Sequence, residues 1–213
     1  MRKLLLLSAV ALLAACGGTG QAAPQTTAGG TGCTSVTAPA GKQRTEPKPA
    51  AALDPSKTYE VTLHTNCGSF TFRLAVATSP ATTASFVSLA RKGYFDKTVF
   101  HRIVPGFVIQ GGDPTGTGTG GPGYTTVDRP PASTSYTHGL VAMAKTQAEA
   151  AGTSGSQFFV VTAQNAQLPP DYAVLGKVIK GLAVVDAIGK LGDPSTQQPT
   201  ETVEIESATV TVQ

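Results

Sequence analysis

Residues 100–113 read FHRIVPGFVIQGGD and are the most informative stretch of the chain. Two short apolar runs in and around it, Val99–Ile103 and Phe107–Gln110, predict strands that adjoin each other. The two strands carry a cation, an amide and an aromatic ring: Arg102, Gln110 and Phe107. Such a mixture of side chains on neighbouring strands favours a functional site over core packing alone.

Alternation of apolar and polar residues predicts further strands on both sides of this stretch. Thr58–Thr65 has apolar residues at every second position and is predicted to be a half-buried strand. A turn at 66–68 joins it to a second strand, Ser69–Ala75, as a hairpin. The later predicted strands are Leu140–Ala144, Gln157–Thr162, Val174–Val178 and Thr202–Val212. A change of phase near Glu206 and Ser207 predicts a bulge in the last of them.

Two helices are predicted. Ser79 can cap the first, Pro80 suits its first position, and Gly93 can end it. Its apolar residues between these limits share one stripe at helical spacing. Gly181–Gly189 is predicted to be a second, short helix. Many short strands and only two helices are typical of a β-barrel capped by helices.

Two further segments strengthen the first, namely GLVAMA at 139–144 and GSQFF at 155–159. In this order and spacing, the three segments closely resemble the cyclophilin family, and the resemblance extends from about Tyr59 to Val212. It implies an all-β-dominated fold, a closed eight-stranded antiparallel barrel capped by two helices. It also implies a peptidyl-prolyl cis-trans isomerase that needs no cofactor and no metal.

The chemistry of this reaction suits Arg102. Rotation about an amide costs about 18–20 kcal/mol because resonance is lost, and Xaa-Pro bonds isomerise over tens to hundreds of seconds unaided. In the twisted transition state the prolyl nitrogen becomes pyramidal and gains a lone pair. A fixed guanidinium donor meets that lone pair only in the transition state, so its binding is differential. Arg102 is therefore the predicted catalytic donor.

The resemblance assigns the remaining site residues. Gln110 is expected to hold Arg102 and to contact the substrate backbone. The apolar pocket for the proline ring is expected to consist of Phe107, Met143, Phe159 and Leu168. Ala144 and the backbone of Lys145 are expected to hydrogen-bond the residue before proline, as an added strand would. The expected residues around the groove are Gln157, Tyr172 and His101.

Three positions depart from common members of the family. Gln167 stands where many eukaryotic members carry Trp, which puts strong cyclosporin binding in doubt. Tyr172 replaces a common His but keeps a hydrogen-bonding tip, and Lys145 replaces a frequent Asn. None of the three changes the Arg102 donor or the proline pocket, so activity is expected to persist.

The N-terminus predicts export and a lipid anchor. Residues 1–15 combine a short positive stretch with an apolar run and match a lipoprotein signal peptide. The run ends in LAAC at 13–16, which resembles a bacterial lipobox and makes Cys16 the lipidated residue. The protein is then expected outside the cytoplasm, anchored to the bacterial cell membrane. The alternative is an ordinary signal peptide followed by an incidental cysteine.

Residues 16–56 are rich in Gly, Thr, Ala and Pro without periodicity, which predicts a disordered tether before an isomerase domain at 57–213. Cys33 lies in this tether and Cys67 in the first hairpin turn. An exported protein permits disulfides, so we expect these two cysteines to pair; two free thiols are the alternative.

Composition and the remaining motifs exclude several classes of function. Once residues 1–15 are removed, 14 basic residues face 13 acidic ones, and no basic stripe predicts a nucleic-acid partner. Residues 116–121 match G-x-G-x-x-G, but Pro122 and Gly123 follow where a dinucleotide site needs a helix, so a loop flanking the groove is expected. Residues 152–156 lack the serine-hydrolase spacing. The three histidines form no zinc-ligand cluster: His64, His101 and His138.

The predicted function is isomerisation of Xaa-Pro bonds in exported or cell-envelope proteins, which assists their folding. The partners are proline-containing segments of unfolded or partly folded proteins, and the protein is expected to be a monomer. The alternative is a peptide-binding or chaperone module that uses the same groove with little turnover.

Overall fold

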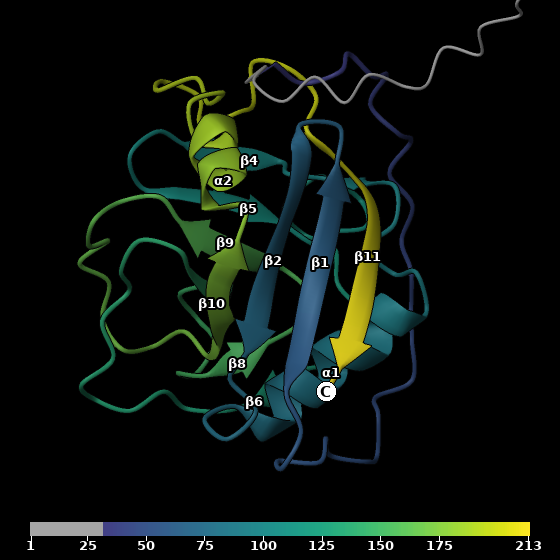
Figure 1. The fold of residues 1–213 in the computed structure, drawn as a ribbon, viewed down its shortest axis with the longest axis vertical. Helices are drawn as coiled ribbons and strands as arrows, with labels where there is room; N and C mark the ends of the chain where they lie inside the picture. Colours follow the sequence, from purple (N-terminus) through teal and green to yellow (C-terminus); the bar gives the residue numbers. More distant parts are fainter. Residues whose placement is uncertain (1–31) are drawn as a thin grey trace, which may run out of the picture. The chain divides into compact units, whose positions relative to one another are not determined.

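The computed structural model describes residues 32–213, and these form a nine-stranded antiparallel sheet, a two-stranded sheet and two helices (Figure 1). The order of the large sheet is β3-β11-β1-β2-β10-β7-β9-β5-β4. Its strands are β1 (Tyr59–Thr65), β2 (Gly68–Leu74), β3 (Thr98–Val99), β4 (Arg102–Val104), β5 (Val108–Gly111), β7 (Leu140–Met143), β9 (Phe158–Val161), β10 (Val174–Lys180) and β11 (Glu204–Val212). The small sheet pairs β6 (Thr126–Val127) with β8 (Thr153–Ser154). The predicted signal peptide and Cys16 lie outside the described residues.

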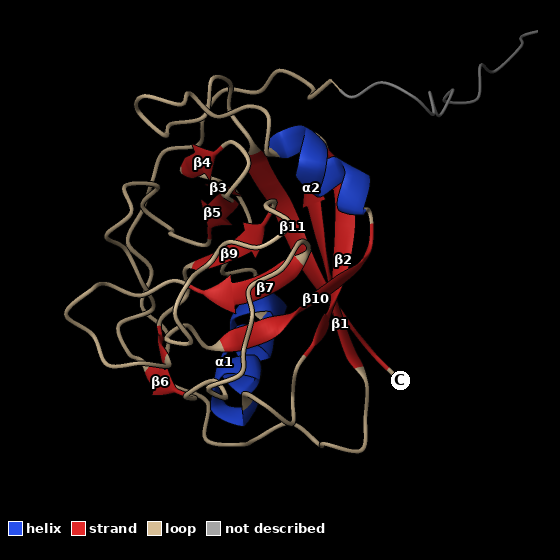
Figure 2. Cartoon of the chain, turned by 90° about the vertical axis from the view of Figure 1, so that its left-hand side faces the viewer, coloured by secondary structure: helices blue, strands red, loops and turns tan. Residues whose placement is uncertain are grey.

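The predicted sheet-dominated, barrel-like fold with two helices is confirmed, except that the large sheet has nine strands instead of eight and is not closed. The large sheet is curled, so that β3 and β4, the first and last strands in its order, lie next to each other (Figure 2). The predicted strand Val99–Ile103 breaks at Phe100, whose ring is fully buried and whose N–H donates to Val203 O. Beyond the break, Ile103 N–H donates to Gln197 O. The predicted strand is therefore divided into β3, which pairs with β11, and β4, which pairs with β5, and the chain before β11 runs along the other side of β4.

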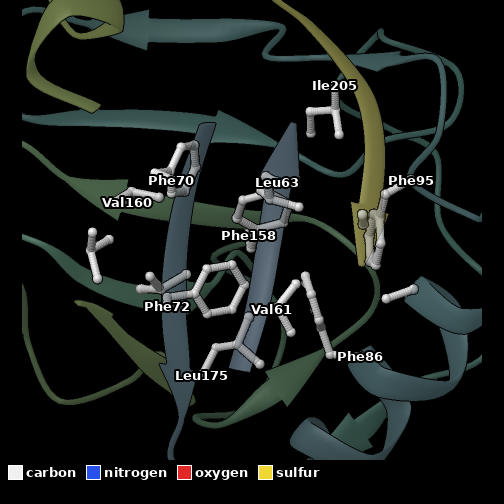
Figure 3. Packing of buried hydrophobic residues seen from close by; sticks show 14 of the residues in the cluster. Val61, Leu63, Phe70, Phe72, Phe86, Phe95, Phe158, Val160, Leu175 and Ile205 are labelled. Atoms are coloured by element: carbon white, nitrogen blue, oxygen red, sulfur yellow. The ribbon is translucent and has the colours of Figure 1, made fainter. Parts of the chain in front are cut away.

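The core lies between the β1–β2 hairpin, α1 (Pro80–Arg91) and the central strands (Figure 3). Phe86 of α1 stacks on Phe95 at 4.5 Å and meets Phe72 and Phe158 edge-on at 5.7 and 5.6 Å. All four rings are 1% exposed or less. Burial of each such side chain stabilises the fold by about 1.5–3 kcal/mol. This packing fixes the curvature of the strands that carry the site.

Helix α1 begins at Pro80, as predicted, but its cap differs from the prediction. The Ser79 hydroxyl is buried and has no hydrogen-bond partner among the described residues. Instead, Asp128 Oδ2 accepts from Thr82 N at 2.6 Å, which satisfies one of the donors that a helix leaves unpaired at its start. Gly93, with φ of 67°, follows the last turn as predicted.

The second helix is α2 (Leu182–Ile188). Across residues 32–213, neither helix has the length and apolarity needed to cross a membrane.

The predicted bulge in β11 is confirmed. His64 lies opposite Ser207 and Thr65 lies opposite Ile205, which leaves Glu206 without a partner in β1. The extra residue explains the change of apolar phase along this strand, because residues on both sides of it can still point into the core.

Residues 32–56 have no regular secondary structure, but they do not form a free tether. Figure 1 draws this segment in purple along the outside of the domain. Backbone donors of Thr34, Lys42 and Glu46 bond to carbonyl groups far along the chain, at distances of 2.8–2.9 Å. The predicted domain boundary at residue 57 is therefore corrected, and the folded unit includes the segment from residue 32.

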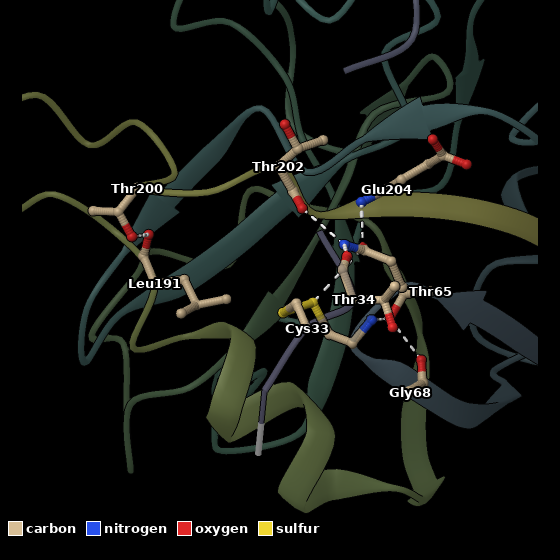
Figure 4. The surroundings of a disulfide bond; sticks show 10 residues. Cys33, Thr34, Thr65, Gly68, Leu191, Thr200, Thr202 and Glu204 are labelled. Atoms are coloured by element: carbon tan, nitrogen blue, oxygen red, sulfur yellow. Dashed lines mark hydrogen bonds between the residues drawn. A yellow bond between two sulfur atoms is a disulfide. The ribbon is translucent and has the colours of Figure 1, made fainter. Parts of the chain in front are cut away.

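The predicted disulfide between Cys33 and Cys67 is present (Figure 4). The neighbouring Asn66 side chain donates to Thr34 O and Thr202 O and accepts from Glu204 N. The bridge and this amide together attach the start of the described chain to the β1–β2 turn.

We predict that the double variant Cys33→Ser/Cys67→Ser lowers the free energy of unfolding by about 3–4 kcal/mol, because the bridge closes a loop across 34 residues. Urea unfolding without reductant measures this. Wild-type protein treated with a strong reductant should match the variant. Equal transition midpoints for the variant and the oxidised wild type would contradict the prediction.

Candidate functional site

The site is organised around Arg102, the first residue of β4. In the antiparallel register Arg102 lies opposite Gln110 of β5, and its Nη1 donates to Gln110 Oε1 at 3.3 Å. Its Nε donates to Gln197 Oε1 at 2.8 Å. Burial lowers the pKa of Arg102, and Tyr172 opposes this change. An arginine side chain loses its proton only in strong base, so the guanidinium remains charged at neutral pH.

A small apolar pocket lies beside this guanidinium. Its volume is about 180 Å³, below the roughly 300–1,000 Å³ of pockets for drug-sized ligands. The lining residues are Arg102, Phe107, Val108, Gln110, Ala144, Lys145, Phe159, Leu168 and Tyr172. Phe107 comes from the β4–β5 turn, Phe159 from β9, and Leu168 and Tyr172 from the loop after β9. The pocket can hold one small apolar group next to a fixed cation.

Tyr136 packs against Phe159 and Tyr172, the aromatic residues of the pocket, from the protein interior. Tyr172 meets Phe159 edge-on at 5.5 Å. The fully buried Tyr136 hydroxyl donates to Tyr172 O at 2.6 Å and accepts from Tyr172 N at 3.0 Å. Burial raises the pKa of Tyr136 to about 12, so the hydroxyl keeps its proton. Sequence reasoning missed this residue, which lies in a segment without apolar periodicity.

A second cavity of about 600 Å³ adjoins the first. The two share Gln110, Ala144 and Lys145 in their linings. The opposite wall of the larger cavity comes from the loop 114–125, which we call the rim. The two cavities form a groove long enough for several residues of an extended chain.

A chain of hydrogen bonds connects Arg102 to the rim. Gln110 Nε2 donates to Gln157 Oε1 at 3.1 Å. Gln157 Nε2 in turn donates to Gly118 O at 2.9 Å and to Gly120 O at 3.0 Å. The orientation of the guanidinium and the conformation of the rim are thus linked through two amides.

Asp113 holds the rim from inside. This fully buried carboxylate accepts from the backbone N–H groups of Thr115, Thr117, Gly118 and Gly120 at 2.6–3.2 Å. Burial alone would raise the pKa of Asp113, but these hydrogen bonds outweigh it and the pKa is lowered. The G-x-G-x-x-G match at 116–121 therefore lies in a loop beside the groove, as predicted, and no helix begins there.

Two expected site residues lie elsewhere. Met143 is 1% exposed, packs in the main core and does not line the pocket, so its assignment to the proline pocket is wrong. Its strand alternates, and Ala142 and Ala144 point to the pocket side instead. His101 lines neither cavity. It lies beneath the rim, where burial lowers its pKa, and its Nδ1 has no hydrogen-bond partner among residues 32–213.

Ala144 and Lys145 lie at the groove, but Ala144 N–H already donates to Gln157 O at 2.9 Å. Only its carbonyl is therefore available to an added strand. Lys145 Nζ donates to the carbonyl groups of Thr146 and Glu149 and lies 5.5 Å from the centre of the Tyr172 ring. Within the described part of the chain, no group of three His, Cys, Asp or Glu residues could hold a metal ion.

Comparison with known proteins identifies the family. The model of the cyclophilin type peptidyl-prolyl cis-trans isomerase family matches residues 60–210. Peptidyl-prolyl cis-trans isomerase A of Mycobacterium tuberculosis is 39% identical over 174 residues, which cover 73% of this chain and 94% of the relative. A peptidyl-prolyl cis-trans isomerase of Arabidopsis thaliana is 37% identical over 150 residues, covering 68% and 90%. The chain belongs to the cyclophilin family.

A solved cyclophilin type isomerase of Cryptosporidium parvum agrees with this conclusion. It superposes with a TM-score of 0.66 at 31% identity and covers 72% of this chain and 98% of its own. Isomerase activity is therefore the activity of the cyclophilin domain described above, and the predicted family and enzyme class are confirmed.

The cyclophilin site includes a contact that sequence reasoning missed. Gln197 lies in the loop between α2 and β11, has a positive φ of 61°, and accepts from Arg102 through its side chain. No local pattern marks this position, because its contact with Arg102 spans 95 residues.

We predict that Asp113→Asn lowers the free energy of unfolding by about 2 kcal/mol at pH 7, because the amide turns an NH₂ group toward buried N–H donors. The pKa of Asp113 is lowered in the folded state, so its contribution is present above the ordinary value of 3.8 and is lost as pH falls below it. The wild type and the variant should therefore converge in acid.

Urea unfolding at several pH values between 7 and the acid range measures this convergence. Asp54→Asn is the control, because the exposed Asp54 carboxylate accepts hydrogen bonds only from Ser56 in its own turn and holds no distant segment. A difference between wild type and Asp113→Asn that stayed constant into acid would refute the assigned role of the carboxylate.

Proposed function

We propose that Arg102 catalyses rotation about Xaa-Pro bonds, with the proline ring in the apolar pocket. The observation that carries the proposal is a charged guanidinium, fixed by two glutamine carbonyls, at the edge of a pocket of about 180 Å³. Nothing in this arrangement requires a nucleophile, because no covalent bond to the substrate forms.

The geometry favours the twisted state over either planar isomer. With the ring held between Phe107, Phe159 and Leu168, the prolyl nitrogen faces the Arg102 side of the pocket. Arg102 Nη2 makes no hydrogen bond within the described residues, so it can donate to the nitrogen lone pair. That lone pair exists only when amide resonance is lost, so the donor stabilises the transition state selectively.

The chain before proline is proposed to bind along Ala144. Its carbonyl is free of backbone partners among residues 32–213, and it lines both cavities. The N–H of an extended peptide can donate to this carbonyl, as a strand added beside it would. Residues further from proline then enter the larger cavity. One structural relative was crystallised in the presence of the dipeptide Ala-Pro, which is consistent with a proline-directed groove.

We further propose that the clients are exported or cell-envelope proteins and that lipid on Cys16 holds the enzyme at the membrane. The signal-like segment 1–15 and the LAAC sequence at 13–16 support export and lipidation. The disulfide supports an oxidising compartment, since cytosolic proteins rarely keep such bonds.

A peptide-binding module with little turnover is the second candidate. The cavity of about 600 Å³ favours it, because this cavity would contact the chain without help from Arg102. Separate variants of Arg102 and of the pocket distinguish the two candidate functions.

We predict that Arg102→Ala lowers kcat/KM for an Xaa-Pro peptide. The decrease should correspond to a loss of about 2–4 kcal/mol of transition-state stabilisation. Arg102→Lys keeps the charge but not the fork of donors, so it should recover only part of the rate. Phe107→Ala should also reduce the rate, by opening the pocket. A protease-coupled isomerisation assay measures all three. Rates in all proteins equal to the uncatalysed rate would favour the binding module.

We predict that Cys16→Ser abolishes lipidation of the full chain. Wild-type protein expressed in bacteria with labelled palmitate should carry the label and sediment with membranes, whereas the variant should do neither. Gln21→Ser is the control, because it lies a few residues beyond the lipobox. Equal labelling of the wild type and Cys16→Ser would contradict the anchor.

A further inference from the structure

The outer face of the rim is covered by residues 41–48, which we call the strap. Lys42 N donates to Pro114 O and Glu46 N donates to Pro122 O, both at 2.9 Å. Gln43 Nε2 donates to Gly121 O at 2.7 Å. Lys48 Nζ donates to Thr125 O at 2.9 Å. The strap therefore bonds to the rim at both of its ends.

The strap and the rim are in close contact. A Cβ atom added to Gly41 would lie 2.0 Å from Thr115 O, and one added to Gly123 would lie 2.7 Å from Thr45 Cγ2. Neither distance leaves room for a side chain. The two segments are packed against each other without an intervening layer.

Arg44 anchors the strap to the body of the domain. Its guanidinium donates to Gly93 O at 3.3 Å, to Asp96 O at 2.9 Å and to Tyr94 O. These carbonyls follow the C-terminus of α1, where a positive charge is favoured. Glu46 adds an ion pair with Lys92 at 2.7 Å. The anchor points follow directly after α1, a helix with a buried face.

The rim needs such support because it has few restraints of its own. It belongs to no strand, and its many glycines are free to adopt other conformations. Asp113 holds the backbone N–H groups between residues 115 and 120. The carbonyl groups at 121, 122 and 125 bond to the strap instead. Within residues 121–125, Tyr124 Oη also bonds to Ser85 Oγ of α1 at 2.9 Å, so this half of the rim is held by the strap together with α1.

We propose that the strap is a positioning element of the peptide groove. By holding residues 121–125, it keeps the wall of the larger cavity in place for the part of the substrate that precedes proline. Arg44 acts through the rim and touches no substrate, so it is a positioning residue. The proposal rests on the proposed function, since it assumes that a peptide occupies the groove.

The test compares two substrates. One has a single residue before proline, and the other has four and so reaches the larger cavity. Arg44→Ala removes all three hydrogen bonds of the anchor and should raise KM for the long substrate by about tenfold. Its kcat, and both constants for the short substrate, should stay near wild type. Arg44→Lys should recover part of the loss.

Arg91→Ala is the matched control. Arg91 is an exposed arginine in the last turn of α1, and its side chain makes no hydrogen bond among the described residues. This variant should behave as wild type with both substrates. Gln43→Ala removes a single rim contact and leaves the anchor intact, so it should give a smaller loss of the same kind even if Arg44→Ala folds poorly.

Hydrogen exchange gives a readout that does not depend on turnover. The N–H groups of Lys42 and Glu46, which donate to rim carbonyls, should exchange faster in Arg44→Ala than in Arg91→Ala. Unchanged exchange, or equal losses with the short and the long substrate, would overturn the role of the strap. If the wild type showed no isomerase activity, the proposed function would be refuted. Faster exchange in Arg44→Ala would still show, in that case, that the strap restrains the rim.

Discussion

The position of one guanidinium at the edge of an apolar pocket depends on two glutamine side chains from distant parts of the chain. Gln110 reaches Arg102 across the β4–β5 ladder, and Gln197 reaches it from the loop before β11. Each carbonyl accepts one N–H of the fork, which leaves Nη2 without a hydrogen-bond partner among the described residues. A donor that is already oriented loses little entropy when the transition state forms.

The contact between Gln197 and Arg102 depends on the position of β4 at the end of the strand order. Because β4 is an edge strand, its outer side is covered by a loop rather than by another strand, and that loop brings Gln197 to Arg102. A closed barrel would place a strand at the same edge. The groove extends from there along Gln110 and Gln157 to the rim, whose shape is set by Asp113 inside and by the strap outside. The core packing of the β1–β2 hairpin and α1 supports the strands that carry this groove.

Local patterns in the sequence predicted most of the strands, both helices and the bulge at Glu206, whereas the resemblance to the cyclophilin family supplied the residues around Arg102. They succeeded where burial on one face imposes a period, as in β1 and β2. They failed where long-range contacts decide the outcome. Phe100 interrupts a strand because its ring enters the core, Met143 turns inward for the same reason, and residues 32–56 are held by carbonyl groups far along the chain. No periodic signal accompanies such contacts, so Gln197, Tyr136 and the strap were not predicted.

The most direct test of the central claim is a crystal structure of the protein with a bound proline-containing peptide. The account predicts the proline ring between Phe107, Phe159 and Leu168, with a guanidinium nitrogen of Arg102 at hydrogen-bond distance, about 3 Å, from the prolyl nitrogen or its adjoining carbonyl. A peptide bound with its ring outside this pocket, or an Arg102 side chain turned toward solvent, would contradict it.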